Sequence, residues 1–237
     1  MIEIRELTKK YKDIIAVDNL SLSINDGELV AFLGINGAGK STTIKMLSCL
    51  TAPTNGDAYI NGKSIVKNSD EVKKIIAVVP QEEAIAKGLS VRENLELISG
   101  IFNIENRNER IIKITEKLGL KEHLNKKSAK LSGGYKRRLS IAMALITEPQ
   151  VLFLDEPTVG LDVIARSELW DIIRSLKGKV TVFLTTHYME EAEKLSDRVA
   201  IMKNGRLIKF GTQNEIKEEA DTEKFEDAFV KLVKEAE

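Results

Sequence analysis

The chain lacks the features that mark secreted and zinc-binding proteins. Its 237 residues include one cysteine, Cys49, which excludes a disulfide framework and a cysteine-based zinc cluster. We expect this thiol to pack as a small apolar side chain in a reducing compartment. An excess of charge of one sign is also missing, because 36 Lys and Arg residues balance 36 Asp and Glu residues. That balance argues against a protein that wraps nucleic acid or coats a membrane through its charge.

Long hydrophobic runs are absent as well. No stretch reaches the roughly 18 apolar residues that indicate a membrane-spanning helix, and the N-terminal residues have no apolar core of a signal peptide. We therefore expect a cytoplasmic protein that works at a membrane only through a partner carrying the membrane spans. With 43% hydrophobic and 30% charged residues, the chain is expected to be globular rather than disordered.

One glycine-rich segment stands out. Residues 34–41 read Gly-Ile-Asn-Gly-Ala-Gly-Lys-Ser, after an apolar run at 29–33 and before a helical pattern from residue 42. A strand, a glycine-rich loop and a helix in this order predict a phosphate-binding loop, in which backbone N–H groups face the anion. Lys40 would reach the β- and γ-phosphates and the Ser41 hydroxyl would ligate Mg²⁺. The alternative is a glycine-rich turn that binds nothing.

Two acids follow a second buried strand. Residues 151–154 are a continuous apolar run, which is typical of a central parallel strand, and Asp155 and Glu156 come directly after it. Asp155 would act on the Mg²⁺ shell through water, and Glu156 could polarise an attacking water as a general base. The alternative is a pair of solvated acids at a strand end.

A second anion site is indicated at the start of another helix. Ser132, Gly133 and Gly134 combine a hydroxyl, bare backbone N–H groups and the helix dipole. Two phosphate sites in one chain favour a dimer in which each subunit supplies half of a pocket. The alternative is an ordinary helix cap, although paired glycines are unusual within a first turn.

The remaining pattern predicts how the chain is organised. Dipeptides Asn61-Gly62 and Asn204-Gly205 predict tight hairpins, and a capping box predicts a helix from Ser90 to about residue 101. Further helices are expected at 105–118 and at 132–147, where Ser132 is the expected cap, with a basic, solvated loop around the surface residue His123 between them. Residues 84–148 should form an all-helical insertion, and 1–83 with 149–212 the core. A helical tail at 213–237 should dock through Phe225 and Phe229.

In this arrangement the sequence resembles the ATP-binding cassette (ABC) ATPases from about residue 2 to residue 212. The motifs occur in the family's order. They are the A-loop aromatic Tyr11, the Walker A loop at 34–41, the Q-loop Gln81, the signature motif at 131–135, the Walker B strand and acids at 151–156, the D-loop at 160–162 and the switch histidine His187. Ile35 and Tyr135 replace the family's common proline and glutamine, and neither change removes a phosphate-contacting group. Residues 135–139 and 159–162 look most like ATPases of ABC-2-type exporters.

The resemblance implies an α/β fold. It has a P-loop NTPase core with a mainly parallel sheet, an N-terminal antiparallel β subdomain and an all-helical signature subdomain. It also implies the residues of the site. The catalytic candidates are Glu156, His187 and Lys40. The candidates for binding ATP are Tyr11, which would stack on adenine, with Val17, Gly34, Ile35, Asn36, Gly37, Ala38, Gly39, Lys40, Ser41, Thr42, Ser132, Gly133 and Gly134. The candidates for binding Mg²⁺ are Ser41, Gln81 and Asp155.

The function implied by the resemblance is that of an ATP-hydrolysing subunit of an ABC transporter, with an exporter favoured. Two cassettes, as a homodimer or with a close homologue, would sandwich ATP head to tail and drive integral membrane permease subunits from the cytoplasmic face of the cell membrane. One rival is a soluble ABC ATPase that powers a non-transport assembly machine. Another is a nucleotide-binding module that never hydrolyses ATP. The transported substrate belongs to the membrane partner and is not encoded in this chain.

Overall fold

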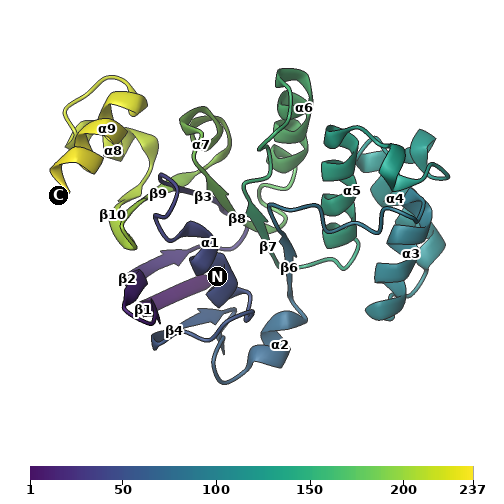
Figure 1. The fold of residues 1–237 in the computed structure, drawn as a ribbon, viewed down its shortest axis with the longest axis horizontal. Coiled ribbons are helices and arrows are strands. Elements are labelled where there is room, and N and C mark those ends of the chain that lie inside the picture. The colour runs from purple at the N-terminus through teal and green to yellow at the C-terminus, as the bar shows by residue number, and fades with distance from the viewer. Residues whose placement is uncertain (237) are drawn as a thin grey trace.

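Six strands form the central sheet of the computed structural model, which describes residues 1–236 (Figure 1). The strand order is β10-β9-β3-β8-β7-β6, and every neighbouring pair is parallel except β9 with β10. The strands are β3 (Leu29–Leu33), β6 (Ile76–Val79), β7 (Val151–Asp155), β8 (Thr181–Thr186), β9 (Arg198–Lys203) and β10 (Arg206–Gly211). The predicted mainly parallel core sheet is confirmed.

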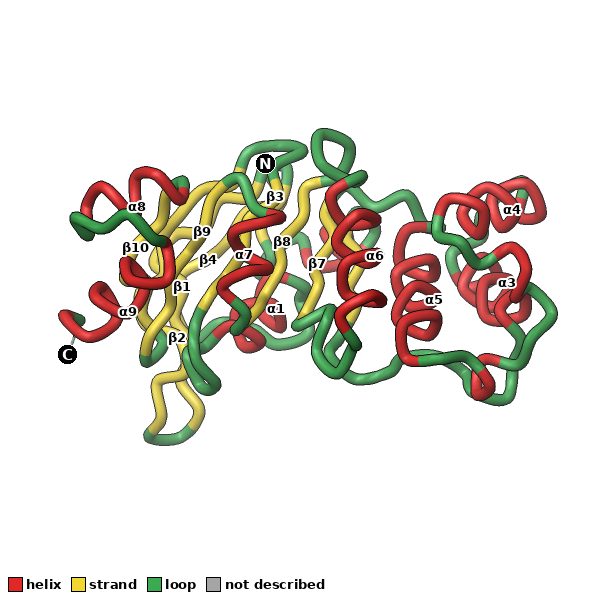
Figure 2. Tube along the Cα trace, turned by 90° about the horizontal axis from the view of Figure 1, so that it is seen from above, coloured by secondary structure: helices red, strands yellow, loops and turns green. Residues whose placement is uncertain are grey.

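Strand β3 shows why the central strands are apolar throughout. All of its residues are buried, with Leu29, Ala31 and Leu33 in one core cluster and Val30 and Phe32 in another. A parallel strand covered on both faces needs apolar side chains at every position. Helices α6 (Val163–Arg174) and α7 (Met189–Leu195) cover the first face, and α1 (Lys40–Leu47) lies on the other (Figure 2). The glycine-rich loop is therefore held between a rigid strand and a packed helix.

A second sheet is antiparallel and has the order β2-β1-β4-β5. Its strands are β1 (Ile2–Tyr11), β2 (Ile14–Ile24), β4 (Asn55–Ile60) and β5 (Lys63–Ser64). The turn between β4 and β5 holds Asn61 at φ 49° and Gly62 at φ 78°, which is the pair of positive φ angles that an Asn-Gly hairpin supplies. The predicted antiparallel N-terminal part is confirmed.

A group of helices extends from one end of the central sheet (Figure 1). It comprises α3 (Val91–Ile101), α4 (Arg107–Lys117) and α5 (Gly133–Leu145). The predicted capping box is present, since Ser90 Oγ accepts from the Glu93 amide and the Glu93 carboxylate accepts from the Ser90 amide. The expected loop at 121–130 instead contains two short 3₁₀ turns, Lys121–His123 and Ser128–Lys130. His123 is half-buried because its ring packs edge-on against Tyr135 at 4.3 Å between centroids.

Two elements differ from the expected pattern for local reasons. Helix α2 (Ser69–Lys73) was not predicted, because five mostly polar residues carry no helical periodicity. Helix α5 ends at Leu145, two residues before the expected end, and the predicted cap Ser132 makes no side-chain cap hydrogen bond. The Ser132 side chain is exposed instead.

The tail consists of α8 (Gln213–Glu219) and α9 (Phe225–Glu235), which pack beside β9 and β10 (Figure 1). Phe225 is buried and Phe229 is partly buried against the same core, so both side chains face the core as expected. Residue 237, the last of the expected tail, lies outside the described residues. Within residues 1–236, no helix combines the length and the apolar character that crossing a bilayer requires.

Candidate active site

The carboxyl ends of three neighbouring strands build the site. Strand β3 pairs with β8 and β8 pairs with β7, with Leu33 opposite Thr186 and Asp155 opposite Thr185. The glycine-rich loop leaves β3, Asp155 and Glu156 end β7, and His187 follows β8. Because parallel strands end at the same edge of a sheet, groups from distant parts of the sequence meet at this edge.

The glycines of the loop are needed where the chain runs close to other backbone. A Cβ on Gly34 would lie 2.5 Å from the Met202 carbonyl oxygen. Gly39 has φ +100°, and a Cβ there would lie 2.5 Å from the Ala16 carbonyl oxygen. Any larger residue at either position would displace the loop from strands β9 and β2.

Lys40 is the cation of the loop and is only 5% exposed. Its Nζ donates to the carbonyl oxygens of Gly34 at 2.7 Å and Ile35 at 3.2 Å, and lies 3.7 Å from Glu156 Oε1. Burial lowers the pKa of Lys40, and the charges of Glu156 and Asp155 oppose that shift. The loop thus places a cation beside a carboxylate at the point where a phosphate would enter.

Asp155 is held by two hydroxyl groups. Ser41 Oγ donates to Asp155 Oδ1 at 3.0 Å, and Thr185 Oγ1 donates to the same oxygen at 2.5 Å. Mg²⁺ prefers oxygen ligands and typically takes one or two protein groups besides water and phosphate. The hydroxyl of Ser41 and the carboxylate of Asp155 form a donor set of that kind, so the residues fit the ion.

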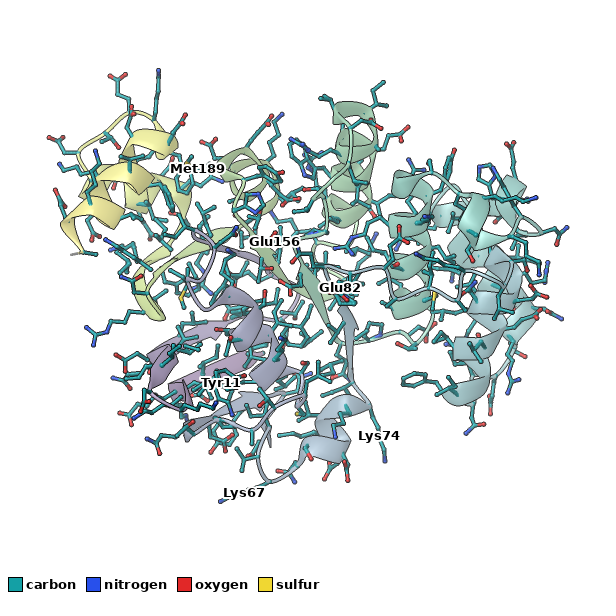
Figure 3. The ribbon with its side chains drawn as sticks, viewed as in Figure 1. Tyr11, Lys67, Lys74, Glu82, Glu156 and Met189 are labelled. Carbon is teal, nitrogen blue, oxygen red and sulfur yellow. The ribbon has the colours of Figure 1, made fainter. Side chains whose placement is uncertain are left out.

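Glu156 adopts a backbone conformation that is rare outside glycine, with φ 45°. Its amide donates to the carbonyl oxygen and to the Oγ1 of Thr185, both at 3.1 Å. His187 Nδ1 lies 3.2 Å from Glu156 Oε2 but without the alignment of a hydrogen bond. Figure 3 shows Glu156 at the centre of the molecule, close to the ends of the core strands. The strained backbone aims a nearly buried carboxylate between a lysine and a histidine.

These groups line one open cleft of about 750 Å³. Its lining includes many of the predicted residues, namely Asn36, Gly37, Ala38, Gly39, Lys40, Ser41, Thr42, Gln81, Glu156 and His187. Asp155 lies immediately beneath it, bonded to Ser41. The cleft also has walls that were not predicted, formed by Ile14, Ile15 and Ala16 of β2 with Val159 and Asn204.

Some predicted residues lie elsewhere. Val17 is fully buried in the core and Ile35 is exposed, and neither lines the cleft. Tyr11 is 45% exposed on the antiparallel sheet, where Lys9 Nζ lies 5.0 Å from its ring centroid, and Figure 3 shows it well separated from Glu156. Adjacent apolar residues in β2 were the only sequence signal for the Ile14 and Ile15 wall.

The predicted second anion site is remote from this cleft within one chain. Ser132 and Gly133 are exposed at the start of α5, and none of residues 132–134 lines the cleft. Gly134 is needed for packing as well, since a Cβ there would lie 3.0 Å from the Ala165 Cβ of α6. The structure therefore leaves this helix start open to a second molecule.

The model of the family described as ABC transporter matches residues 17–159, which is more than half of the chain. The chain belongs to the ABC transporter family. A relative that this cassette resembles, the daunorubicin resistance ATP-binding protein DrrA3 of Streptomyces coeruleorubidus, is 42% identical over 89% of this chain and 68% of its own length. The probable multidrug ABC transporter ATP-binding protein YbhF of Escherichia coli is 38% identical over 98% of this chain. The cassette spans only 42% of the length of YbhF.

Solved structures agree with this assignment. An ATP-binding subunit of an ABC transporter superposes with a TM-score of 0.88 and 28% identity over 98% of this cassette and 99% of that chain. A dimeric post-hydrolysis state of the cassette MJ0796, bound to ADP and phosphate, gives a TM-score of 0.80 with 30% identity, covering 90% and 98% of the two chains. The family resemblance and the fold class predicted from the sequence are both confirmed.

Proposed function

We propose that this cassette hydrolyses ATP in a head-to-tail dimer and that hydrolysis drives a separate membrane subunit, in an exporter located at the cytoplasmic face of the membrane. The observation that carries the proposal is the meeting of Lys40, Glu156 and His187 at one edge of the central sheet. The names of two relatives, a probable multidrug ABC transporter protein and a daunorubicin resistance protein, support export.

The proposed hydrolytic step uses this geometry. Glu156 would accept a proton from water and orient that water toward the γ-phosphoryl group, in line with the leaving oxygen. Lys40 would stabilise the negative charge on the transferred phosphoryl group, because the charge of a buried side chain is weakly screened by solvent. His187, whose Nδ1 lies 3.2 Å from Glu156 Oε2, would contact both the carboxylate and the γ-phosphate and fix their relative position. Ser41, Asp155 and Gln81 would hold Mg²⁺, which would neutralise phosphate charge.

Two contacts complete the proposed pocket. Tyr11 would stack its aromatic ring on adenine, and Val17 would support that part of the sheet. Ser132, Gly133 and Gly134 of a second subunit would close over the γ-phosphate from the opposite side. The dimeric MJ0796 cassettes support such an arrangement, because they share this fold.

The membrane partner would dock in an apolar groove of about 340 Å³ beside the segment that carries Gln81. Strand β6, the segment just after α1, and helices α3 and α5 line it, with Leu50 70% exposed and Phe102 51% exposed. Exposed apolar side chains in a groove are the usual mark of an interaction surface.

Replacing Leu50 by glutamate tests the membrane role. In cells that make the complete system, tagged wild-type cassette should sediment with membranes. Leu50→Glu should lower that fraction by roughly tenfold or more, because docking would bury an unpaired charge. Hydrolysis by the purified variant should stay near the wild-type rate. Ile112→Glu, which alters an exposed apolar side chain on α4 outside the groove, is the control. Wild-type cassette that stays in the soluble fraction would instead support the assembly-machine alternative.

A further inference from the structure

Arg137 is a buried cation on the helix that follows the signature glycines. It lies in α5 and is 8% exposed. Its guanidinium group donates to three backbone carbonyl oxygens, with Nε to Pro157 at 2.7 Å, Nη1 to Pro80 at 2.5 Å and Nη2 to Asp155 at 2.9 Å. The planar fork of an arginine spreads its donors over three nitrogen atoms and can hold three separated backbone points, whereas a lysine presents its three donors from a single nitrogen.

The three carbonyl groups belong to functional segments of the core. Those of Asp155 and Pro157 flank Glu156, so Arg137 holds the chain on both sides of the residue proposed as the general base. The third, from Pro80, immediately precedes Gln81, which lines the cleft. One side chain of the helical group thus contacts two segments that shape the site.

The charge of Arg137 is costly to keep in this place. Within residues 1–236, Arg137 has no carboxylate partner in an ion pair. Burial lowers its pKa to about 10, a shift that the charges of Asp155 and Glu191 oppose, so it remains protonated at neutral pH. Apolar residues of similar volume often stabilise such sites better than buried charges do. A buried guanidinium group that bonds only to carbonyl oxygens therefore indicates that the protein needs those three carbonyl groups held in place.

The backbone conformation of Glu156 explains why these carbonyl groups must be held. Its φ of 45° is unfavourable for a residue with a side chain, and such backbone persists only where its surroundings hold it. Thr185 bonds the Glu156 amide, and Arg137 bonds the carbonyl groups just before and just after the residue. Without Arg137, the peptide groups around Glu156 would be free to relax toward ordinary angles.

We propose that Arg137 is a positioning residue that links the orientation of α5 to the backbone of Glu156. The proposal rests on the hydrolytic role of Glu156 given above. A rotation of the helical group that carries α5 would move the guanidinium group and release or restore the conformation of Glu156. Since α5 begins at Ser132 to Gly134, contact of a second subunit with that helix start would reach Glu156 through the same side chain.

Two substitutions test this role with two readouts. Arg137→Gln removes the fork and the charge, and Arg137→Lys keeps the charge without the fork. We expect the ATP Kd to stay within about twofold, because Lys40 and the loop are unchanged, and kcat to fall about 10- to 100-fold in Arg137→Gln and less in Arg137→Lys. The Val159 amide donates to the Glu156 carbonyl oxygen at 3.3 Å, so it reports on the same backbone. In nucleotide-free protein, hydrogen exchange should accelerate about tenfold at the amides of Glu156 and Val159.

Arg198→Gln is the matched control. Arg198 is another partly buried arginine whose guanidinium group bonds several partners. It donates to Glu28 and to the Ser23 carbonyl oxygen, toward the opposite end of the sheet. Its loss should lower Tm without changing kcat or exchange at Glu156.

Unchanged exchange at Glu156 and Val159 in Arg137→Gln, or the same acceleration in Arg198→Gln, would overturn the proposal. So would a kcat loss accompanied by an equal loss of ATP affinity. If Arg137→Gln does not fold, the same measurements on Arg137→Lys are compared with the wild type and with Arg198→Gln. The exchange readout needs no ATP, so a wild-type cassette without ATPase activity would contradict the proposed function while leaving this test intact.

Discussion

Glu156→Gln is expected to lower the rate of ATP hydrolysis by about 10²- to 10⁴-fold, the range associated with removal of a general base. The amide keeps the size of the side chain and its place beside Lys40 and His187, but it cannot accept a proton from water. ATP binding should persist, because the loop at 34–41 and Ser41 are unaltered. Steady-state phosphate release and equilibrium binding of ATP measure the two effects separately.

The same variant should accumulate as a dimer when ATP is present. If the γ-phosphate holds two cassettes together and hydrolysis releases them, blocking hydrolysis leaves the closed state populated. Light scattering with ATP and with ADP distinguishes the two states. The control is Glu190→Gln, which alters an exposed carboxylate on α7 that pairs with Lys194 and leaves Glu156 in place. Hydrolysis by Glu156→Gln at the wild-type rate would remove Glu156 from the role of base.

Lys40→Met should abolish ATP binding at concentrations that saturate the wild type, with a loss of affinity of roughly 100-fold or more. Lys40 is buried, and no other cationic side chain lines the cleft in the described part of the chain. Its removal takes away the lysine that would contact the phosphates within the loop and leaves Glu156 without the ammonium group at 3.7 Å. Calorimetric titration with ATP measures the loss.

A lysine on the same helix serves as the comparison for Lys40→Met. Lys45 is exposed on α1, and Lys45→Met should bind ATP as the wild type does, because that side chain does not line the cleft. Circular dichroism should show both variants folded. ATP binding by Lys40→Met within a few-fold of the wild type would mean that the loop does not hold the phosphates as described.

The sequence was sufficient wherever a short segment determines its own structure. Residues 34–41 carry their glycines, lysine and serine in one stretch, and the capping box at Ser90 and Glu93 depends on residues three apart. The core strands were recognisable because burial on both faces demands continuous apolar runs, as in β3 and β7. These local rules correctly indicated the fold class.

The sequence was insufficient where function depends on contacts between distant segments. Thr185 bonds both Asp155 and the Glu156 amide, yet in the sequence it is one polar residue at a strand end. Arg137 reads as part of a basic run, and only the packing of α5 against the core shows that it is buried. The wall formed by Ile14 and Ile15 depends on how β2 crosses the loop. Such roles are properties of tertiary packing and have no signature in spacing.

The central claim is that each ATP pocket combines Lys40 of one subunit with Ser132 of another, and mixing two inactive variants tests it most directly. Lys40→Met lacks one half of the pocket, and Ser132→Arg obstructs the other half. Each mixed dimer would contain one intact pocket, with Lys40 from the second variant facing Ser132 from the first. We predict that the mixture hydrolyses ATP at least about tenfold faster than the two variants measured separately, approaching a quarter of the wild-type rate if dimers form at random. A mixture no faster than its separate components would contradict a pocket shared between subunits.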